Sequence, residues 1–138
     1  MKLCPYLFFD GQCETAFKFY EQCLGAKVEA LMTYSGSPME ANCPDEWGPK
    51  IMHGELRLGD RVLMGADAMP GQYEAPQGAS LMIGIDDPDE AEKTFKALAE
   101  GGKVTMPIEE TFWAAKFGAL IDRFGIPWMI NCDKPDNS

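Results

Sequence analysis

The order of predicted strands and helices repeats once along the chain, and this repeat constrains the fold more than any other feature. Each half begins with an apolar strand, continues with an amphipathic helix and ends with three further strands. In the first half, apolar side chains recur at helical spacing over Cys13–Leu24, and Gly25 follows where a helix commonly ends. The strands of this half are predicted at Leu3–Phe9, Lys27–Tyr34, Ile51–Leu58 and Arg61–Asp67, with a hairpin turn at Gly59-Asp60.

The second half follows the same order. Asp87 can cap a helix, and Pro88 suits a first helical turn, so we predict a helix over Asp89–Glu100. Gly101-Gly102 ends it, much as Gly25 ends the first helix. The strands are predicted at Ala79–Asp86, Lys103–Ile108, Ala115–Ile121 and Pro127–Cys132, the last two joined around Arg123-Phe124-Gly125.

Two similar βαβββ halves in one chain indicate an internal duplication. We therefore predict an α+β fold of paired βαβββ modules, with cupped mixed sheets and helices on the convex face. Residues 1–138 are expected to form a single domain with halves 1–68 and 79–132, loops at 35–49 and 68–78, and a polar tail at 133–138. A single helix covers one face of a four-stranded sheet, so the other face has to meet the second half, a ligand or a partner chain.

Charge and composition exclude several classes of function. The formal net charge is −10, and the chain has no cluster of Lys and Arg that would follow a phosphate backbone, so we expect no nucleic acid partner. No apolar run approaches the ~20 residues that span a membrane. The first residues, Met1–Pro5, lack the apolar stretch of a signal peptide, and we expect a cytoplasmic location.

The five cysteines are an odd number without a CxxC pair, which does not favour a disulfide or zinc framework. Cys13 and Cys23 lie on the predicted core face of the first helix, where cysteine acts as a small apolar side chain. Cys43 lies in the first long loop and is the best candidate for a free thiol.

Several short motifs, each weak alone, occur in a specific order over nearly the whole chain. They are Pro5-Tyr6-Leu7-Phe8-Phe9-Asp10-Gly11, Phe19-Tyr20 with Leu24-Gly25, Lys50-Ile51-Met52-His53-Gly54-Glu55-Leu56, Thr111-Phe112-Trp113, and Asp122-Arg123-Phe124-Gly125 with Trp128-Met129-Ile130-Asn131. In this order the chain resembles the vicinal oxygen chelate (glyoxalase/bleomycin resistance/dioxygenase) superfamily. The similarity is to its PhnB-like branch, often labelled a 3-demethylubiquinone-9 3-methyltransferase domain.

The resemblance implies a ligand cavity on the concave sheet face, and in the glyoxalases four His, Gln or Glu side chains hold a divalent metal there. The matching positions here are Pro5, Met64, Ser80 and Met129, which are poor ligands for such a metal. We therefore predict no metal. The methyltransferase label does not imply that chemistry, because no glycine-rich strand-to-helix loop is present for S-adenosylmethionine, and we predict no cofactor.

His53, the only histidine of the chain, is the first candidate for chemistry. On the strand Ile51–Leu58, strict alternation places His53 and Glu55 on one face with Ile51 and Arg57, opposite an apolar face. Histidine suits proton transfer near neutral pH, and a carboxylate beside it would orient its ring. The alternative interpretation is an ordinary polar strand face with a cross-strand pair.

The remaining candidates would line the cavity. Trp113 follows a strand in a loop, where it could form the wall of a pocket or pack in the core or a dimer contact. Methionines adapt to irregular apolar ligands, although methionine is also a common core residue. The predicted ligand-binding residues are Leu7, Met64, Ser80, Met82, Trp113 and Met129.

Three functions remain open on this basis. The first is a metal-free, homodimeric protein that binds a small, partly apolar molecule, as the antibiotic-sequestering members of the superfamily do. The second is a metal-free enzyme of isomerase or lyase type that acts on a small carbonyl metabolite, with His53 as acid or base. The third is a metal-dependent enzyme with ligands that the motifs do not reveal. Missing metal ligands count against the third, and we favour binding.

Overall fold

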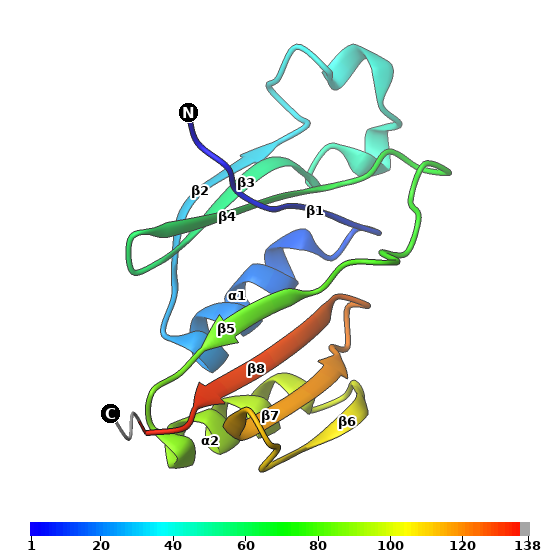
Figure 1. Ribbon diagram of the computed structural model, residues 1–138. Coiled ribbons are helices and arrows are strands. Elements are labelled where there is room, and N and C mark those ends of the chain that lie inside the picture. The colour runs from blue at the N-terminus through cyan, green and yellow to red at the C-terminus, as the bar shows by residue number, and fades with distance from the viewer. Residues whose placement is uncertain (136–138) are drawn as a thin grey trace. The chain divides into compact units, whose positions relative to one another are not determined.

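A computed structural model describes residues 1–135 of the chain. It divides into two compact units, one over Met1–Glu74 and one that begins at Ala75 (Figure 1). The predicted halves 1–68 and 79–132 fall within these units. Each unit is described by itself below.

The first unit is a four-stranded mixed sheet with one helix. The strand order is β1-β4-β3-β2, in which β1 pairs with β4 in parallel and the other pairs are antiparallel. Figure 1 shows β1 beside β4, although these strands are the first and last of the unit in sequence. The elements are β1 (Tyr6–Phe9), α1 (Cys13–Leu24), β2 (Lys27–Thr33), η1 (Glu40–Asn42), η2 (Asp45–Trp47), β3 (Ile51–Leu58) and β4 (Arg61–Asp67).

The second unit repeats this topology. Its sheet has the order β5-β8-β7-β6, with β5 parallel to β8 and the other pairs antiparallel. The elements are β5 (Leu81–Gly84), α2 (Pro88–Ala99), β6 (Lys103–Glu109), β7 (Ala114–Ile121) and β8 (Pro127–Asp133). The α+β class, the duplicated βαβββ order and the mixed sheets predicted from the sequence are confirmed, and both sheets are open.

The boundaries of the helices agree with prediction more closely than those of the first strands. The helix α1 has the predicted bounds, and α2 begins and ends one residue earlier than predicted. The strand β1 begins at Tyr6 instead of Leu3, whose side chain is fully exposed. Pro5 lacks an N–H and only accepts a hydrogen bond, from the backbone N–H of Met64, so the sheet ends there.

The loop predicted at 35–49 contains two short 3₁₀ turns, η1 and η2, that the sequence analysis did not predict. The carboxylate of Glu40 accepts a hydrogen bond from the backbone N–H of Gly36, and the Ser37 hydroxyl donates to the carbonyl of Tyr34. Such local side-chain bonds stabilise a tight turn without any apolar periodicity. They explain why a search for periodic patterns missed the turns.

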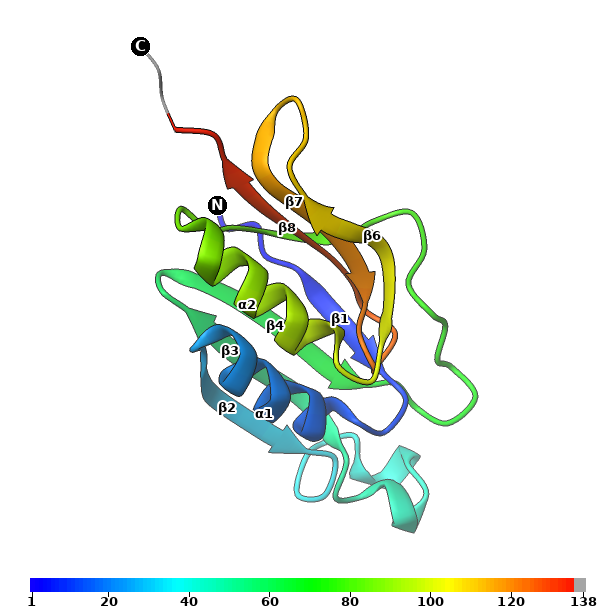
Figure 2. The same ribbon diagram turned by 90° about the horizontal axis from the view of Figure 1, so that it is seen from below.

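The core of the first unit lies between α1 and one face of its sheet. Phe17 of α1 lies over two strand glycines, since a β-carbon at Gly54 would stand 3.1 Å and one at Gly65 2.9 Å from its ring. The ring of Phe9 meets Phe17 edge to face at 6.1 Å between centroids. Figure 2 looks onto α1 as it crosses its sheet. The glycines thus let an aromatic side chain approach the sheet closely.

The second unit uses a related device on β7. A β-carbon at Gly118 would stand 2.7 Å from the ring of Phe95 on α2 and 2.9 Å from the backbone of Ile108 on β6.

The buried carboxylate of Asp122 organises the β7–β8 turn, because it accepts hydrogen bonds from the N–H groups of Phe124, Ile126 and the Trp128 indole. Figure 2 shows β7 and β8 running side by side.

A buried carboxylate, Asp67, closes the first unit. Gln12 precedes α1 without a side-chain cap, and Asp67 at the end of β4 instead accepts the N–H of Cys13 at 2.9 Å. Its other oxygen accepts the N–H of Ile51 at 2.8 Å, and its backbone carbonyl accepts the hydroxyl of Tyr34 at 2.7 Å. One residue therefore joins the end of β4 to the starts of α1 and β3.

Cys13 is fully buried beside Asp67, as its position on the core face predicted, whereas Cys23 is half-buried. Burial raises the pKa of the Cys13 thiol from 9.0 to about 12, and the negative charges of Asp67 and Glu14 add to the effect. Above pH 9 an unfolded chain releases this proton while the folded chain keeps it until about pH 12. The free energy of unfolding therefore falls with rising pH in this window.

We expect Cys13→Ala to be less sensitive to alkali than the unmodified chain. A difference of about 2.7 kcal/mol at pH 11, two pH units above 9.0, follows from ~1.4 kcal/mol per pKa unit. Urea unfolding at pH 8 and pH 11 measures it, and Cys43→Ala, a change of a half-buried loop thiol, is the control. Equal alkaline losses in Cys13→Ala and the unmodified chain would contradict the prediction.

Candidate functional site

The sheet of the first unit has one face against α1 and one face open. Tyr6 and Phe8 of β1 point to the open face, with 40% and 52% of their surface exposed, while Phe9 is buried. Leu7 alternates with Tyr6 and Phe8 and pairs with Gly65, the glycine beneath Phe17. Leu7 therefore lies on the helix-covered face, and the structure does not bring this predicted ligand-binding residue to the open face.

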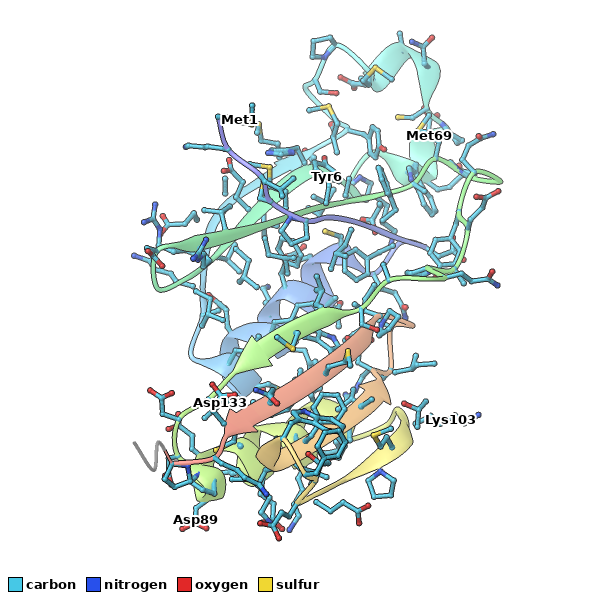
Figure 3. The ribbon with its side chains drawn as sticks, viewed as in Figure 1. Met1, Tyr6, Met69, Asp89, Lys103 and Asp133 are labelled. Atoms are coloured by element: carbon cyan, nitrogen blue, oxygen red, sulfur yellow. The ribbon has the colours of Figure 1, made fainter. Side chains whose placement is uncertain are left out.

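Three polar side chains form a connected group on the open face. The Tyr6 hydroxyl lies 3.0 Å from Nδ1 of His53, and Nε2 of the same ring lies 3.5 Å from a carboxylate oxygen of Glu55. The Tyr6 and His53 rings are 5.6 Å apart between centroids. Tyr6, labelled in Figure 3, comes from β1, whereas the other two come from β3. The sequence placed His53 and Glu55 together correctly, and it missed Tyr6.

The backbone pairing explains how these residues meet. Met64 of β4 pairs with Tyr6 on one side and with Glu55 on the other, so the three lie in one row across the sheet. Met64, half-buried, lies between the aromatic ring and the carboxylate, and its sulfur is 3.9 Å from that of Cys4. Met64, predicted from the sequence to line a cavity, therefore shares the sheet face of Glu55.

The strict alternation expected for β3 fails at its first residue. Ile51 was predicted to share the face of His53, but it is buried, with 2% of its surface exposed. The register with β2 shifts here, because Met32 pairs with His53 and the next residue, Thr33, pairs with Ile51. A bulge of this kind inserts one unpaired residue, Met52, and turns Ile51 toward the core.

Burial and ion pairing determine the charges around this connected group. Desolvation raises the pKa of the Tyr6 phenol, with a smaller contribution from Cys13, so the phenol stays protonated near neutral pH. Arg57, further along the same face of β3, pairs with Glu29 of β2 at 3.0 Å. The open face therefore combines the exposed rings of Tyr6 and Phe8, the uncharged hydroxyl of that Tyr6, the His53 imidazole and the carboxylate of Glu55.

The second unit has an open face rich in methionine and aromatic side chains. Met82, Met129, Ala119 and Met106 lie in one row across its four strands. Next to this row the Trp113 ring packs on Phe117 at 5.3 Å between centroids. Ser80 is exposed just before β5.

The predicted candidates are thus divided between the two units. His53, Glu55 and Met64 share the open face of the first, and Met82, Trp113 and Met129 gather near the open face of the second, with Ser80 just before β5. Sequence reasoning missed Tyr6, Phe8, Met106 and Phe112 as exposed apolar residues of these faces. Neighbouring strand residues point to opposite faces, so a buried Phe9 could have indicated an exposed Phe8. No local pattern indicated that β1 pairs with β4, the pairing that brings Tyr6 to His53.

The positions that would hold a metal in the glyoxalases do not fit one here. The first unit offers Pro5, whose only polar backbone atom accepts the Met64 N–H, and the thioether of Met64 itself. The second unit offers the Ser80 hydroxyl and the Met129 thioether, and neither set suits a hard divalent metal. Within residues 1–135, no three or more His, Cys, Asp and Glu side chains gather in a way that could hold a metal ion.

No helix in the described part of the chain combines the length and apolar character needed to cross a membrane.

Comparisons with known proteins agree with the duplicated fold. The chain is 46% identical to protein PA1353 from Pseudomonas aeruginosa over 96% of this chain and 98% of that one, and the structures superpose with a TM-score of 0.88. A glyoxylase/bleomycin resistance protein/dioxygenase domain from Frankia sp. EAN1pec is 12% identical over 97% of this chain and 98% of that chain, with a TM-score of 0.66. The fold is therefore that of the vicinal oxygen chelate proteins, as the motifs indicated.

The family follows from sequence. Residues 1–131 match the model of the 3-demethylubiquinone-9 3-methyltransferase family, the label of the PhnB-like branch. Protein YjdN of Escherichia coli K12 is 36% identical over 142 residues, which cover 97% of this chain and 97% of YjdN. The chain belongs to the 3-demethylubiquinone-9 3-methyltransferase family.

Proposed function

We propose that this chain binds a small, partly apolar molecule on the open face of the β1-β4-β3-β2 sheet. The observation that carries the proposal is the connected group of Tyr6, His53 and Glu55 beside the exposed ring of Phe8. Ligand sites in proteins combine an apolar surface with a few placed polar groups that orient the ligand. The open face of the first unit has both parts.

The exposed rings supply the apolar part of this surface. Tyr6 and Phe8 lie 5.2 Å apart between centroids, and Met32 is exposed beside His53 in the register of β2 with β3. An exposed aromatic pair is unfavourable in water unless a molecule covers it, so its position next to the polar group favours a binding role. Leu7 is not part of this proposed site.

The proposal includes binding without a metal ion, because Pro5, Met64, Ser80 and Met129 do not provide suitable ligand atoms for a hard divalent metal. It also includes a homodimer: Met106 and Phe112 are exposed in the second unit, and a second copy of the chain is our proposed cover for such a surface. Ser80, Met82, Trp113 and Met129 stay predicted ligand contacts, and a cytoplasmic location stays a prediction.

A second candidate function is an enzyme of isomerase or lyase type that acts on a small carbonyl metabolite. The contact of His53 with both a phenol and a carboxylate favours it, since such contacts orient an imidazole for proton transfer. In this alternative His53 is the acid or base, and Glu55 fixes its ring.

Native mass spectrometry of the gently purified chain tests the proposal, because one spectrum reports copy number, bound metal and any bound small molecule. We expect a dimer that carries a small organic molecule and no stoichiometric metal. His53→Ala should lose at least about tenfold in occupancy while its melting temperature changes little, because the side chain makes no large apolar contact. Arg61→Ala, a change at the exposed first residue of β4, is the control.

Three outcomes separate the alternatives. Unchanged occupancy in a folded His53→Ala chain would remove this face from the proposed function. One metal ion per chain that survives mild chelation would contradict metal-free binding. If the recovered molecule gains carbon-bound deuterium when the protein is added in D₂O, and His53→Ala abolishes this gain, the enzymatic alternative is correct.

A further inference from the structure

We propose that the Tyr6 oxygen is the atom that contacts the ligand, and that it accepts a hydrogen bond from a hydroxyl group on a flat, apolar ring. The ligand class is thus a phenol or a ring-borne enol. This inference rests on the proposed function and adds a chemical class to it.

The argument starts with the protons of the connected group. A carboxylate such as Glu55 only accepts hydrogen bonds, so Nε2 of His53, the nitrogen that faces it at 3.5 Å, carries the proton. In a neutral imidazole the other nitrogen is then an acceptor. Nδ1 of His53 lies 3.0 Å from the Tyr6 hydroxyl, and the phenol therefore donates to it.

This donation fixes what Tyr6 can offer to a ligand. A phenol has one proton, which is committed to His53, and its oxygen keeps lone pairs that accept. Within residues 1–135 no other hydrogen bond to this hydroxyl is present. A ligand group that only accepts hydrogen bonds, such as an ether oxygen, receives none from the Tyr6 hydroxyl. A ligand hydroxyl, in contrast, can donate a hydrogen bond to the Tyr6 oxygen.

The surroundings favour an uncharged ring-shaped molecule. Tyr6 and Phe8 form a tilted pair 5.2 Å apart, and both rings are exposed enough to be covered by a flat apolar body. Desolvation, which raises the pKa of Tyr6, also disfavours an ionised ligand close to the phenol. The Arg57 guanidinium on this face already pairs with Glu29, so it adds little attraction for an anion.

Phenol and anisole provide a test, because they share the ring and its oxygen and anisole has a methyl group in place of the donor proton. The single histidine makes ¹⁵N-labelled His53 an unambiguous NMR probe in the full chain. The titration is run at pH 8. We expect phenol to shift the His53 signals saturably and anisole to bind about fivefold more weakly, the ratio that one neutral hydrogen bond provides.

Tyr6→Phe should bind both compounds equally, and Tyr73→Phe, a loop tyrosine in the same unit, should keep the preference for phenol. Equal binding of phenol and anisole to the unmodified chain would overturn the ligand class and leave the binding face intact. A phenol preference that persists in Tyr6→Phe would overturn the role of Tyr6. If neither compound moves the His53 signals, the open face does not take an aromatic ring and the ligand class is overturned, whereas the proposed function is decided separately by the native mass spectra of the chain and of His53→Ala.

Discussion

Replacing Asp67 with Asn is expected to lower the free energy of unfolding of the first unit by about 3 kcal/mol. The two carboxylate oxygens accept the N–H groups of Cys13 and Ile51. An amide has the same shape but only one oxygen, so its NH₂ group would face one of these donors. A buried backbone N–H then loses its partner, and the start of either α1 or β3 loses its anchor.

Urea unfolding measures the loss, and amide hydrogen exchange locates it. Faster exchange should be concentrated at the N–H groups of Cys13 and Ile51. Asp60→Asn, a change at an exposed carboxylate in the β3–β4 turn, is the control and should change stability by less than about 0.5 kcal/mol. Equal stabilities of Asp67→Asn and Asp60→Asn would show that Asp67 does not hold the unit together.

Replacing Gly118 with Ala is expected to destabilise the second unit by about 2 kcal/mol. The added methyl group would stand 2.7 Å from the Phe95 ring and 2.9 Å from the Cα of Ile108. The ring could tilt, but the neighbouring backbone of β6 cannot move without disturbing the β6–β7 pairing. Overpacking of this kind forces strained side chains or a shifted backbone.

Gly84 provides the matched comparison. It is also a strand glycine of the second unit, and within the described residues no heavy atom lies within 4 Å of the β-carbon that alanine would add. Gly84→Ala should therefore be neutral, or stabilising by up to about 1 kcal/mol through the unfolded chain. Thermal melts of both variants test the contrast, and equal melting temperatures would contradict the close approach at Gly118.

Most of the fold could be predicted from the sequence because local residue patterns determine most of its helices and strands. Helical spacing, Gly25 and the cap at Asp87 define the helices nearly to the residue. Alternation and turn residues define the long strands in the same way. The start of β1 is set by its pairing with β4, in which Tyr6 lies opposite Met64 and Pro5 has no N–H to extend the pairing, and the apolar character of Leu3 does not reveal this limit.

The candidate site was predictable only in part, for the same reason. His53 and Glu55 lie two residues apart on one strand, so alternation suffices to bring them together. Tyr6 joins them through the parallel pairing of β1 with β4, across 47 positions of sequence between Tyr6 and His53. The hydrogen bonds of Asp67 also join distant positions, 54 residues apart for Cys13 and 16 for Ile51, and no local pattern distinguishes this aspartate from the exposed ones.

The pairing of the first strand of each unit with its last strand has a consequence for folding during synthesis. When β1 has left the ribosome, it has no strand to pair with until β4 has also been synthesised. In the same way, β5 can pair only after β8 has been synthesised. The hydrogen bond from the Cys13 N–H at the start of α1 to Asp67 can also form only after β4 has been synthesised. Each unit therefore becomes complete in a single late step, and the N-terminal unit can reach its sheet before translation of the other has ended.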